Sequence, residues 1–157
     1  MSVPIIAPFS KHGRNSLMAW TLILAGAGLW TTYDGYYNSA FIQEHTLEDG
    51  SPDSDLLFNR YAPPFCFITS LFLGITLALK LKMRLVADGS ALVIHDKKSI
   101  PYDDIEQIDK TYFESKGYFD VEYRCRSGMK KMRLSDRMYD NLASVLDHLV
   151  LKMTEEA

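Results

Sequence analysis

Two uncharged stretches dominate the sequence: SLMAWTLILAGAGLWTTY at residues 16–33 and YAPPFCFITSLFLGITLAL at residues 61–79. A helix as long as the second stretch rises roughly 28 Å, close to the hydrocarbon thickness of a bilayer. Charged residues make up 24% of the chain, so two such stretches are not expected by chance. The sequence therefore predicts membrane-spanning helices over 16–37 and 61–81. The alternative, a pair of buried core helices, leaves too little chain to enclose them.

The charges on either side of these stretches predict their orientation. Lys11 and Arg14 precede the first span, and Lys80, Lys82 and Arg84 follow the second. Residues 34–60 between them carry six acids and one arginine. Because basic flanks stay on the cytoplasmic side, we expect both termini to be cytoplasmic. The predicted parts are a cytoplasmic N-terminal tail (1–15), a first span (16–37), an acidic extracytoplasmic loop (38–60), a second span (61–81) and a cytoplasmic domain (82–157).

A cleaved signal peptide is the rival interpretation of the first stretch. Ala25, Gly26 and Ala27 have the small-x-small form of a cleavage site. However, the segment of 15 residues that precedes the stretch is longer than the basic region of a signal peptide usually is. In addition, the basic residues before the first stretch and those after the second can both be cytoplasmic only if the chain crosses the membrane twice. We therefore predict that the first span is retained.

Smaller features of the spans predict local structure. Pro63 and Pro64 are expected to begin the second helix, where proline costs no hydrogen bond. The small residues at 25–28 are expected to let a neighbouring helix approach. The leucines expected to face lipid or another helix are Leu22, Leu24, Leu71, Leu73 and Leu79.

Beyond the second span, the pattern changes to short alternating runs. They predict strands over 83–87, 91–95, 99–101, 118–124 and 130–134, with Ile105 and Ile108 facing the core between them. Ser135 or Asp136 is expected to cap a helix that runs to about Met153 and has one apolar face. The predicted fold class is membrane α+β: a two-helix transmembrane hairpin and a small antiparallel sheet domain capped by an amphipathic C-terminal helix.

This domain resembles the bacterial pleckstrin-homology-like (PH-like) domains of small membrane proteins with two transmembrane helices. The resemblance is carried by ADGSALVI at 87–94 and by SIPYDDIEQI at 99–108, and it covers residues 83–153. Five strands fall short of the full pleckstrin-homology pattern, so we expect the second sheet to be short or to be completed by another subunit. The resemblance implies a non-catalytic binding or assembly module in a bacterial cytoplasmic (inner) membrane.

Motifs for catalysis, cofactors or nucleic acid are not recognisable. The net charge of −3 and the pI near 5.8 do not suit a nucleic-acid binder. The chain has no Walker loop, GxGxxG, HExxH, GxSxG or CxxC motif. A Cys125–His148 pair is a weak candidate for nucleophilic catalysis. We expect no enzyme activity, cofactor or metal, two free thiols at Cys66 and Cys125, and a solvated turn at 49–55 in which Ser51 caps a short helix.

Two basic clusters are the candidate contact sites. Lys80, Lys82 and Arg84 are expected mainly to set topology, with lipid headgroup recognition as the alternative. The second cluster predicts one basic patch across a hairpin, and consists of Arg124, Arg126, Lys130, Lys131 and Arg133. It could meet lipid or an acidic protein, or simply be solvated. The predicted function is an accessory or scaffolding subunit that binds other integral membrane proteins and membrane lipid, with homo-oligomerisation open. The alternative is a sensor of anionic lipid headgroups.

Overall fold

The computed structural model describes residues 4–155, which form two compact units. The sheet unit comprises Met1–Arg14 and Leu79–Ala157, and the hairpin unit comprises Asn15–Ala78. The elements in chain order are β1 (Ile5–Pro8), α1 (Lys11–Tyr36), α2 (Ser39–Glu44), α3 (Ser54–Lys80), β2 (Arg84–Ala87), β3 (Ala91–Ile94), β4 (Lys98–Pro101), the 3₁₀ turn η1 (Tyr102–Asp104), β5 (Ile105–Asp109), α4 (Phe113–Lys116), β6 (Tyr118–Cys125), β7 (Gly128–Ser135) and α5 (Leu142–Glu155). The α+β class is confirmed.

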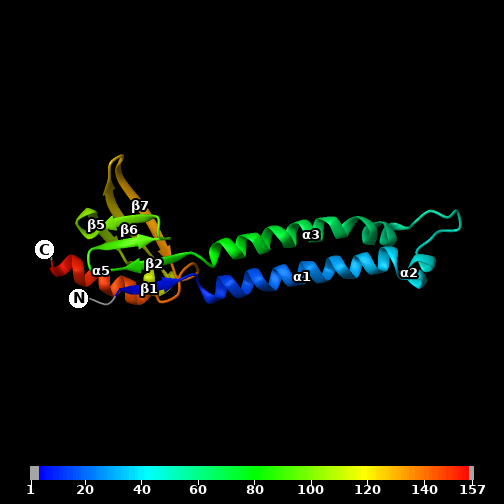
Figure 1. Cartoon of the computed structure of the whole chain (residues 1–157), viewed down its shortest axis with the longest axis horizontal. Coiled ribbons are helices and arrows are strands. Elements are labelled where there is room, and N and C mark those ends of the chain that lie inside the picture. Colours follow the sequence, from blue (N-terminus) through cyan, green and yellow to red (C-terminus); the bar gives the residue numbers. More distant parts are fainter. Residues whose placement is uncertain (1–3, 156–157) are drawn as a thin grey trace. The chain divides into compact units, whose positions relative to one another are not determined.

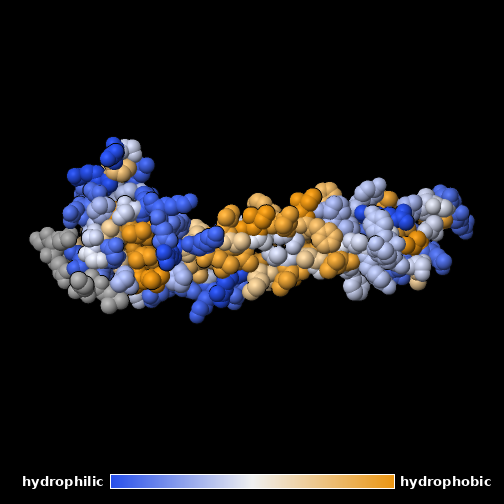
Figure 2. Space-filling model, in the orientation of Figure 1, coloured by the Kyte–Doolittle hydropathy of each residue, from blue (hydrophilic) through white to orange (hydrophobic). Residues whose placement is uncertain are grey.

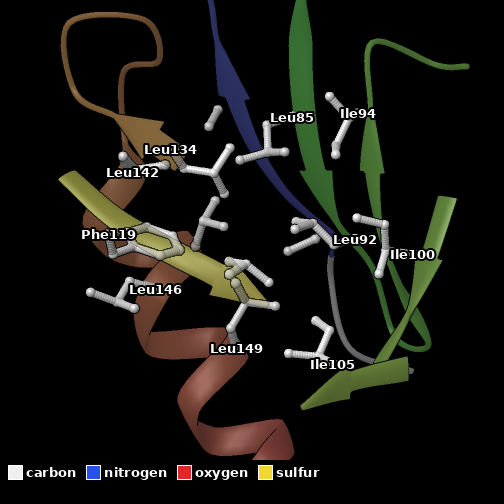
Figure 3. Packing of buried hydrophobic residues seen from close by; sticks show 14 of the residues in the cluster. Leu85, Leu92, Ile94, Ile100, Ile105, Phe119, Leu134, Leu142, Leu146 and Leu149 are labelled. Carbon is white, nitrogen blue, oxygen red and sulfur yellow. The ribbon is translucent and has the colours of Figure 1, made fainter. Parts of the chain in front are cut away.

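Two antiparallel sheets and α5 enclose the core of the sheet unit. The first sheet has the strand order β1-β2-β3-β4, and the second has the order β5-β6-β7. Their inward-facing side chains meet the apolar face of α5, as Figure 3 shows. Alternation along β6 buries Phe119, Val121 and Tyr123. The fully buried large residues of this core are Leu85, Leu92, Phe119, Val121, Leu134, Val145 and Leu149.

The strand β1 completes the first sheet, although no strand is predicted there from the sequence. Ile5 pairs with Ala87 and Pro8 pairs with Arg84, and the alternation buries Ala7 while it exposes Ile6. The residues predicted to be a tail thus contain an edge strand. Four residues are too few for a clear period-two signal, and their partner lies far along the chain. The first sheet is therefore completed from within the same chain.

The C-terminal helix begins at Leu142, so the prediction that Ser135 or Asp136 caps it was wrong. The segment before the helix is held instead by the N-terminal residues. Ser10 donates its amide hydrogen to Met138 O at 2.9 Å and its hydroxyl hydrogen to Arg137 O at 2.8 Å. Asp140 donates its amide hydrogen to Pro8 O at 2.9 Å. These bonds occupy groups that a longer helix would need for its own ladder.

In the hairpin unit, α1 and α3 lie side by side and run in opposite directions (Figure 1). The helix α3 begins at Ser54, so the prediction that Pro63 and Pro64 start it was wrong. Asp53 caps α3, because its Oδ1 accepts the amide hydrogens of Asp55 and Leu56 at 3.0 and 2.9 Å. The prediction that Ser51 caps this helix was therefore wrong, because the cap is Asp53, two residues further along the chain.

The two internal prolines leave backbone carbonyls for α1 to use. Proline has no N–H, so the carbonyls four residues earlier, those of Asn59 and Arg60, lose their helical donors. The hydroxyl of Tyr36 donates to Arg60 O at 3.0 Å. Gly35 lies directly against Asn59, where an added Cβ would be 2.7 Å from the carbonyl oxygen. The helices can therefore touch backbone to backbone at this point.

A stripe at every seventh residue of α1 makes the contact along the hairpin. Thr21 O accepts the hydroxyl hydrogen of Ser70 at 2.9 Å, and Gly28 and Gly35 follow at the same spacing. An added Cβ at Gly28 would lie 3.1 Å from the Phe67 ring, whereas one at Gly26 would meet nothing within 4 Å. Of the small residues at 25–28, Gly28 is therefore the one that the neighbouring helix requires.

By length and composition, one helix in the described part of the chain, α3, is apolar enough to cross a membrane. Only 11% of its most apolar window is buried. In α1, tryptophans, threonines, glycines and tyrosines dilute the hydropathy of the uncharged stretch. The structure thus contains a helical hairpin with one candidate span, where the sequence predicts two.

Candidate contact surfaces

The five basic residues predicted to form one patch lie on and beside the β6–β7 hairpin. In the strand register, Lys131 lies opposite Glu122, Arg133 lies opposite Asp120, and Lys130 lies opposite Tyr123. Because neighbouring residues of a strand point to opposite faces, Lys130 lies on the other face from Lys131 and Arg133. The single basic patch is therefore divided between two faces of the sheet.

Arg133 is bound to a buried carboxylate. Its Nε and Nη2 donate to the two oxygens of Asp120 at 2.8 and 3.0 Å, and its guanidinium lies 4.0 Å from the centre of the Tyr118 ring. The bidentate bond with Arg133 lowers the pKa of Asp120, which is 4% exposed. This arginine holds the sheet together, and its charge is already compensated.

The neighbouring cations on this face are paired as well. Lys131 Nζ lies 3.1 Å from Glu122 Oε1 and 3.6 Å from Asp120 Oδ2. Arg124 donates from Nη2 to Glu106 Oε1 on β5. The outer face of the second sheet thus carries basic and acidic side chains that pair with one another. The signal was present in the sequence, because Asp120 and Glu122 occupy the same alternation as Arg124.

The remaining hairpin cations lie near its tip. Arg126 and Lys130 are exposed, and neither has an ion pair within residues 4–155. Nearby, Lys98 Nζ lies 4.3 Å from the centre of the Tyr123 ring. A hydrogen bond from the side chain of Ser127 lowers the pKa of the Cys125 thiol. Any contact by unpaired cations on this hairpin would therefore be made at its tip.

Cys125 and His148 form hydrogen bonds with different residues. Cys125 Sγ contacts Ser127 and Gly128, at 3.2 and 3.1 Å. His148 Nε2 donates instead to Asp88 O at 3.0 Å. Both Cys125 and Cys66 are free cysteines, as the sequence predicts.

The three basic residues after the second uncharged stretch have separate environments. Arg84 Nε lies 2.9 Å from both carboxylate oxygens of Asp96. Lys80 Nζ lies 5.9 Å from the centre of the Phe9 ring, and Lys82 is exposed. Of the three, Lys82 is the one whose charge has no partner in the described part of the chain.

Large apolar side chains point outward along both long helices. Figure 2 shows hydrophobic residues gathered over the middle of α1 and α3. Of the five leucines predicted to face lipid or another helix, Leu22, Leu71 and Leu79 are exposed and Leu24 and Leu73 are half-buried. Other exposed members of this apolar surface are Trp20, Ile23, Leu29, Trp30, Phe65, Ile68, Phe72 and Ile75. Soluble monomers rarely expose a continuous apolar surface of this kind.

Comparison with known proteins finds no matching protein family, no matching curated protein and no matching solved structure. The fold is therefore described from this chain alone, as a helix pair, small antiparallel sheets and a C-terminal helix.

Proposed function

We propose that the chain is an integral membrane protein of a bacterial cytoplasmic membrane, with two spans and both termini in the cytoplasm. In this proposal it is a non-catalytic accessory or scaffolding subunit. Its spans bind other membrane proteins, and its sheet unit is a PH-like domain that contacts cytoplasmic parts of the same complex.

The pairing of β1 with β2 is the observation that carries the two-span topology. These strands lie on either side of α1 and α3 in the sequence, and they are hydrogen-bonded neighbours in one sheet. Both must therefore be on the same side of any membrane. The number of crossings between Pro8 and Arg84 must then be even, so if α3 crosses, α1 crosses too. The proposal that α3 crosses the membrane is supported by the length and hydropathy of this helix.

The same strand supports retention of the first span. Signal peptidase cleavage after Ala27 would remove β1 and all of the small-residue contacts before Gly28. Ala7 of β1 is fully buried in the core of the sheet unit. A cleaved chain would therefore expose core residues that the intact chain covers.

The outward apolar side chains support contact with lipid and with partner helices. In a bilayer, large apolar groups need not be turned inward, and small residues gather where helices touch. The hairpin unit has this distribution, with Gly28 and Gly35 inside and residues such as Phe72 outside.

The paired cations favour a scaffold over a headgroup sensor. A lipid phosphate at the outer face of β6–β7 would have to compete with Asp120, Glu122 and Glu106 for their basic partners. The sensor alternative depends on Arg126, Lys130 and Lys82, which do not share one strand face.

The topology is tested by labelling single cysteines in intact spheroplasts with a membrane-impermeant maleimide. In a background with Cys66→Ser and Cys125→Ser, Glu48→Cys should react from outside, and Lys97→Cys should react only after lysis. Both positions are exposed, so reactivity reports sidedness. Labelling of both positions before lysis, or of Lys97→Cys alone, contradicts the topology.

The scaffold role is tested by isolating the full chain from native membranes in mild detergent. We expect it to migrate with defined integral membrane proteins, and to lose them when outward residues such as Leu71 and Phe72 are changed to alanine. A lone monomer contradicts the scaffold proposal. The full chain in vesicles tests the sensor: salt-sensitive protection of residues 124–131 from hydrogen exchange by anionic lipid favours the sensor.

A further inference from the structure

The turn between α2 and α3 brings together one imidazole and two carboxylates. His45 follows α2, and Asp53 and Asp55 stand at the beginning of α3. His45 Nδ1 lies 2.7 Å from Asp53 Oδ2 and 3.9 Å from Asp55 Oδ2. All three ligand atoms lie within 4.8 Å of one another. His45 lies at least eight positions before the two aspartates in the sequence, and the turn brings the three ligand atoms close together.

The fold of the turn holds two of these groups in place. Asp53 donates its amide hydrogen to His45 O at 2.9 Å, and Thr46 and Pro52 form a bridge next to this bond. The Oδ1 atom of Asp53 is occupied by the cap of α3, which leaves Oδ2 turned towards the imidazole. The His45 ring also packs against the Phe41 ring, with 4.1 Å between the ring centres and 38° between the ring planes. The ring and the first carboxylate are therefore pre-arranged.

The third group is free to complete a coordination shell. The side chain of Asp55 is 71% exposed, and its carboxylate has no partner other than His45 in the described part of the chain. Ligands bonded tetrahedrally to one Zn²⁺ at about 2.0–2.2 Å lie roughly 3.3–3.6 Å apart. The distance from His45 Nδ1 to Asp53 Oδ2 is shorter than this, at 2.7 Å, and the distance from His45 Nδ1 to Asp55 Oδ2 is longer, at 3.9 Å. Shifts of less than about 1 Å bring both distances into this range.

The donor set selects the class of metal. Imidazole nitrogen suits zinc, copper, iron and nickel, whereas Ca²⁺ and Mg²⁺ are bound almost wholly by oxygen. Two carboxylates and a neutral imidazole carry a charge of −2, which matches a divalent cation. The remaining coordination positions face solvent, because all three side chains are at least partly exposed.

We propose that His45 Nδ1, Asp53 Oδ2 and Asp55 Oδ2 form a binding site for a divalent transition-metal ion, with Zn²⁺ as the reference ion. The site is independent of the scaffold proposal, since it lies wholly within the turn.

The test is calorimetric titration of the full chain, in detergent and without a polyhistidine tag, with Zn²⁺. We expect one ion per chain, and a loss of affinity of more than about tenfold in both His45→Gln and Asp55→Asn. Asp53→Asn should also weaken binding while an asparagine keeps the cap of α3. The matched controls are Asp49→Asn, an exposed acid on the same turn that contacts Ser51 instead, and His12→Gln.

The Asp55→Asn variant separates a loss of metal binding from a loss of folding. The exposed carboxylate of Asp55 contacts only His45 in the described part of the chain. Circular dichroism should show the same helix content in this variant as in the unchanged chain. No Zn²⁺ binding to the unchanged chain overturns the proposal. Equal binding by the unchanged chain, His45→Gln and Asp55→Asn also overturns it. Displacement of Zn²⁺ by millimolar Mg²⁺ would show that the site is not a transition-metal site.

Discussion

The two units of this chain differ in where they place their large apolar side chains. In the sheet unit, large apolar residues such as Phe119, Leu92 and Leu149 are fully buried. In the hairpin unit, the contact between α1 and α3 is made by Gly28, Gly35 and Ser70. Large residues there point outward, and Phe72 is 68% exposed.

This difference bears on the proposed location of the hairpin unit in a membrane. Water drives large apolar side chains to the inside of a protein. Lipid provides no such force between helices, so close approach of small residues and hydrogen bonds hold them together. The sheet unit is organised as a water-soluble core is, and the hairpin unit has the organisation that the proposed membrane location requires.

The largest expected effect is the loss of stability of the sheet unit when a charge is placed in its N-terminal strand, β1. Ala7→Asp puts a carboxylate at a fully buried position against the core, which should lower the free energy of unfolding of that unit by at least about 3 kcal/mol. Hydrogen exchange of β2 and β3 measures it. Ile6→Asp, on the exposed face of the same strand, is the control and should have little effect. Equal effects of both changes would contradict the assignment of β1 to the sheet.

A smaller effect should be confined to the hairpin unit. Gly35→Ala places a Cβ 2.7 Å from the backbone oxygen of Asn59, which cannot rotate away. We expect a loss of about 1–3 kcal/mol in the stability of the hairpin, because a well-packed contact is overfilled. Thermal unfolding in detergent, followed by helix circular dichroism, measures it. Gly26→Ala, which meets nothing within 4 Å, should leave the melting temperature unchanged or slightly raised. The reverse order would contradict the helix packing.

Acid should weaken the sheet unit through Asp120. Its pKa is lowered in the folded chain by Arg133, so its contribution is fully present above the unfolded value near 3.9. That contribution is lost as the pH falls through the folded pKa. Asp120→Asn should therefore melt below the unchanged chain at neutral pH, and the difference should shrink as the pH falls below about 4. A difference that does not change with pH would mean that the ion pair adds no pH-dependent stability.

The smallest expected effect is the loss of one hydrogen bond in the hairpin. Tyr36→Phe removes the donor to Arg60 O, a carbonyl that has lost its helical partner to Pro64. We expect a loss of about 1 kcal/mol. Tyr33→Phe is the control, because Tyr33 is an exposed residue of the same helix whose hydroxyl makes no hydrogen bond in the described part of the chain. The comparison of the two melting temperatures measures the effect.

Local patterns predicted the elements of the sheet unit better than their ends. Alternation located β2, β3, β4, β6 and β7 to within a few residues, because the period of two follows directly from burial on one face. The start of α5 was misplaced because residues 136–141 bind the N-terminal segment. Asp53, rather than Pro63, marks the start of α3, because a polar segment continues the helix beyond the apolar stretch.

The pairing of the candidate contact residues with acids was not foreseen from the sequence. Charges that are close in sequence, such as Lys130 and Lys131, lie on opposite faces of a strand. The partners of the cations come from neighbouring strands, as Glu106 does for Arg124. The His45, Asp53 and Asp55 group was also missed, since the sequence shows its acids but not the closure of the turn.

By itself, the sequence determined where the chain is apolar, where its charges change and which residues alternate, because hydropathy and short-range periodicity are properties of local sequence. Only the tertiary structure decided that Ile5–Pro8 completes a sheet with Arg84–Ala87, that Gly28 and Gly35 admit the second helix, and that three of the five cations on the basic hairpin are paired with acids. Each of these depends on a partner far along the chain. Such partners are chosen by packing and hydrogen bonding in space, which local sequence does not record.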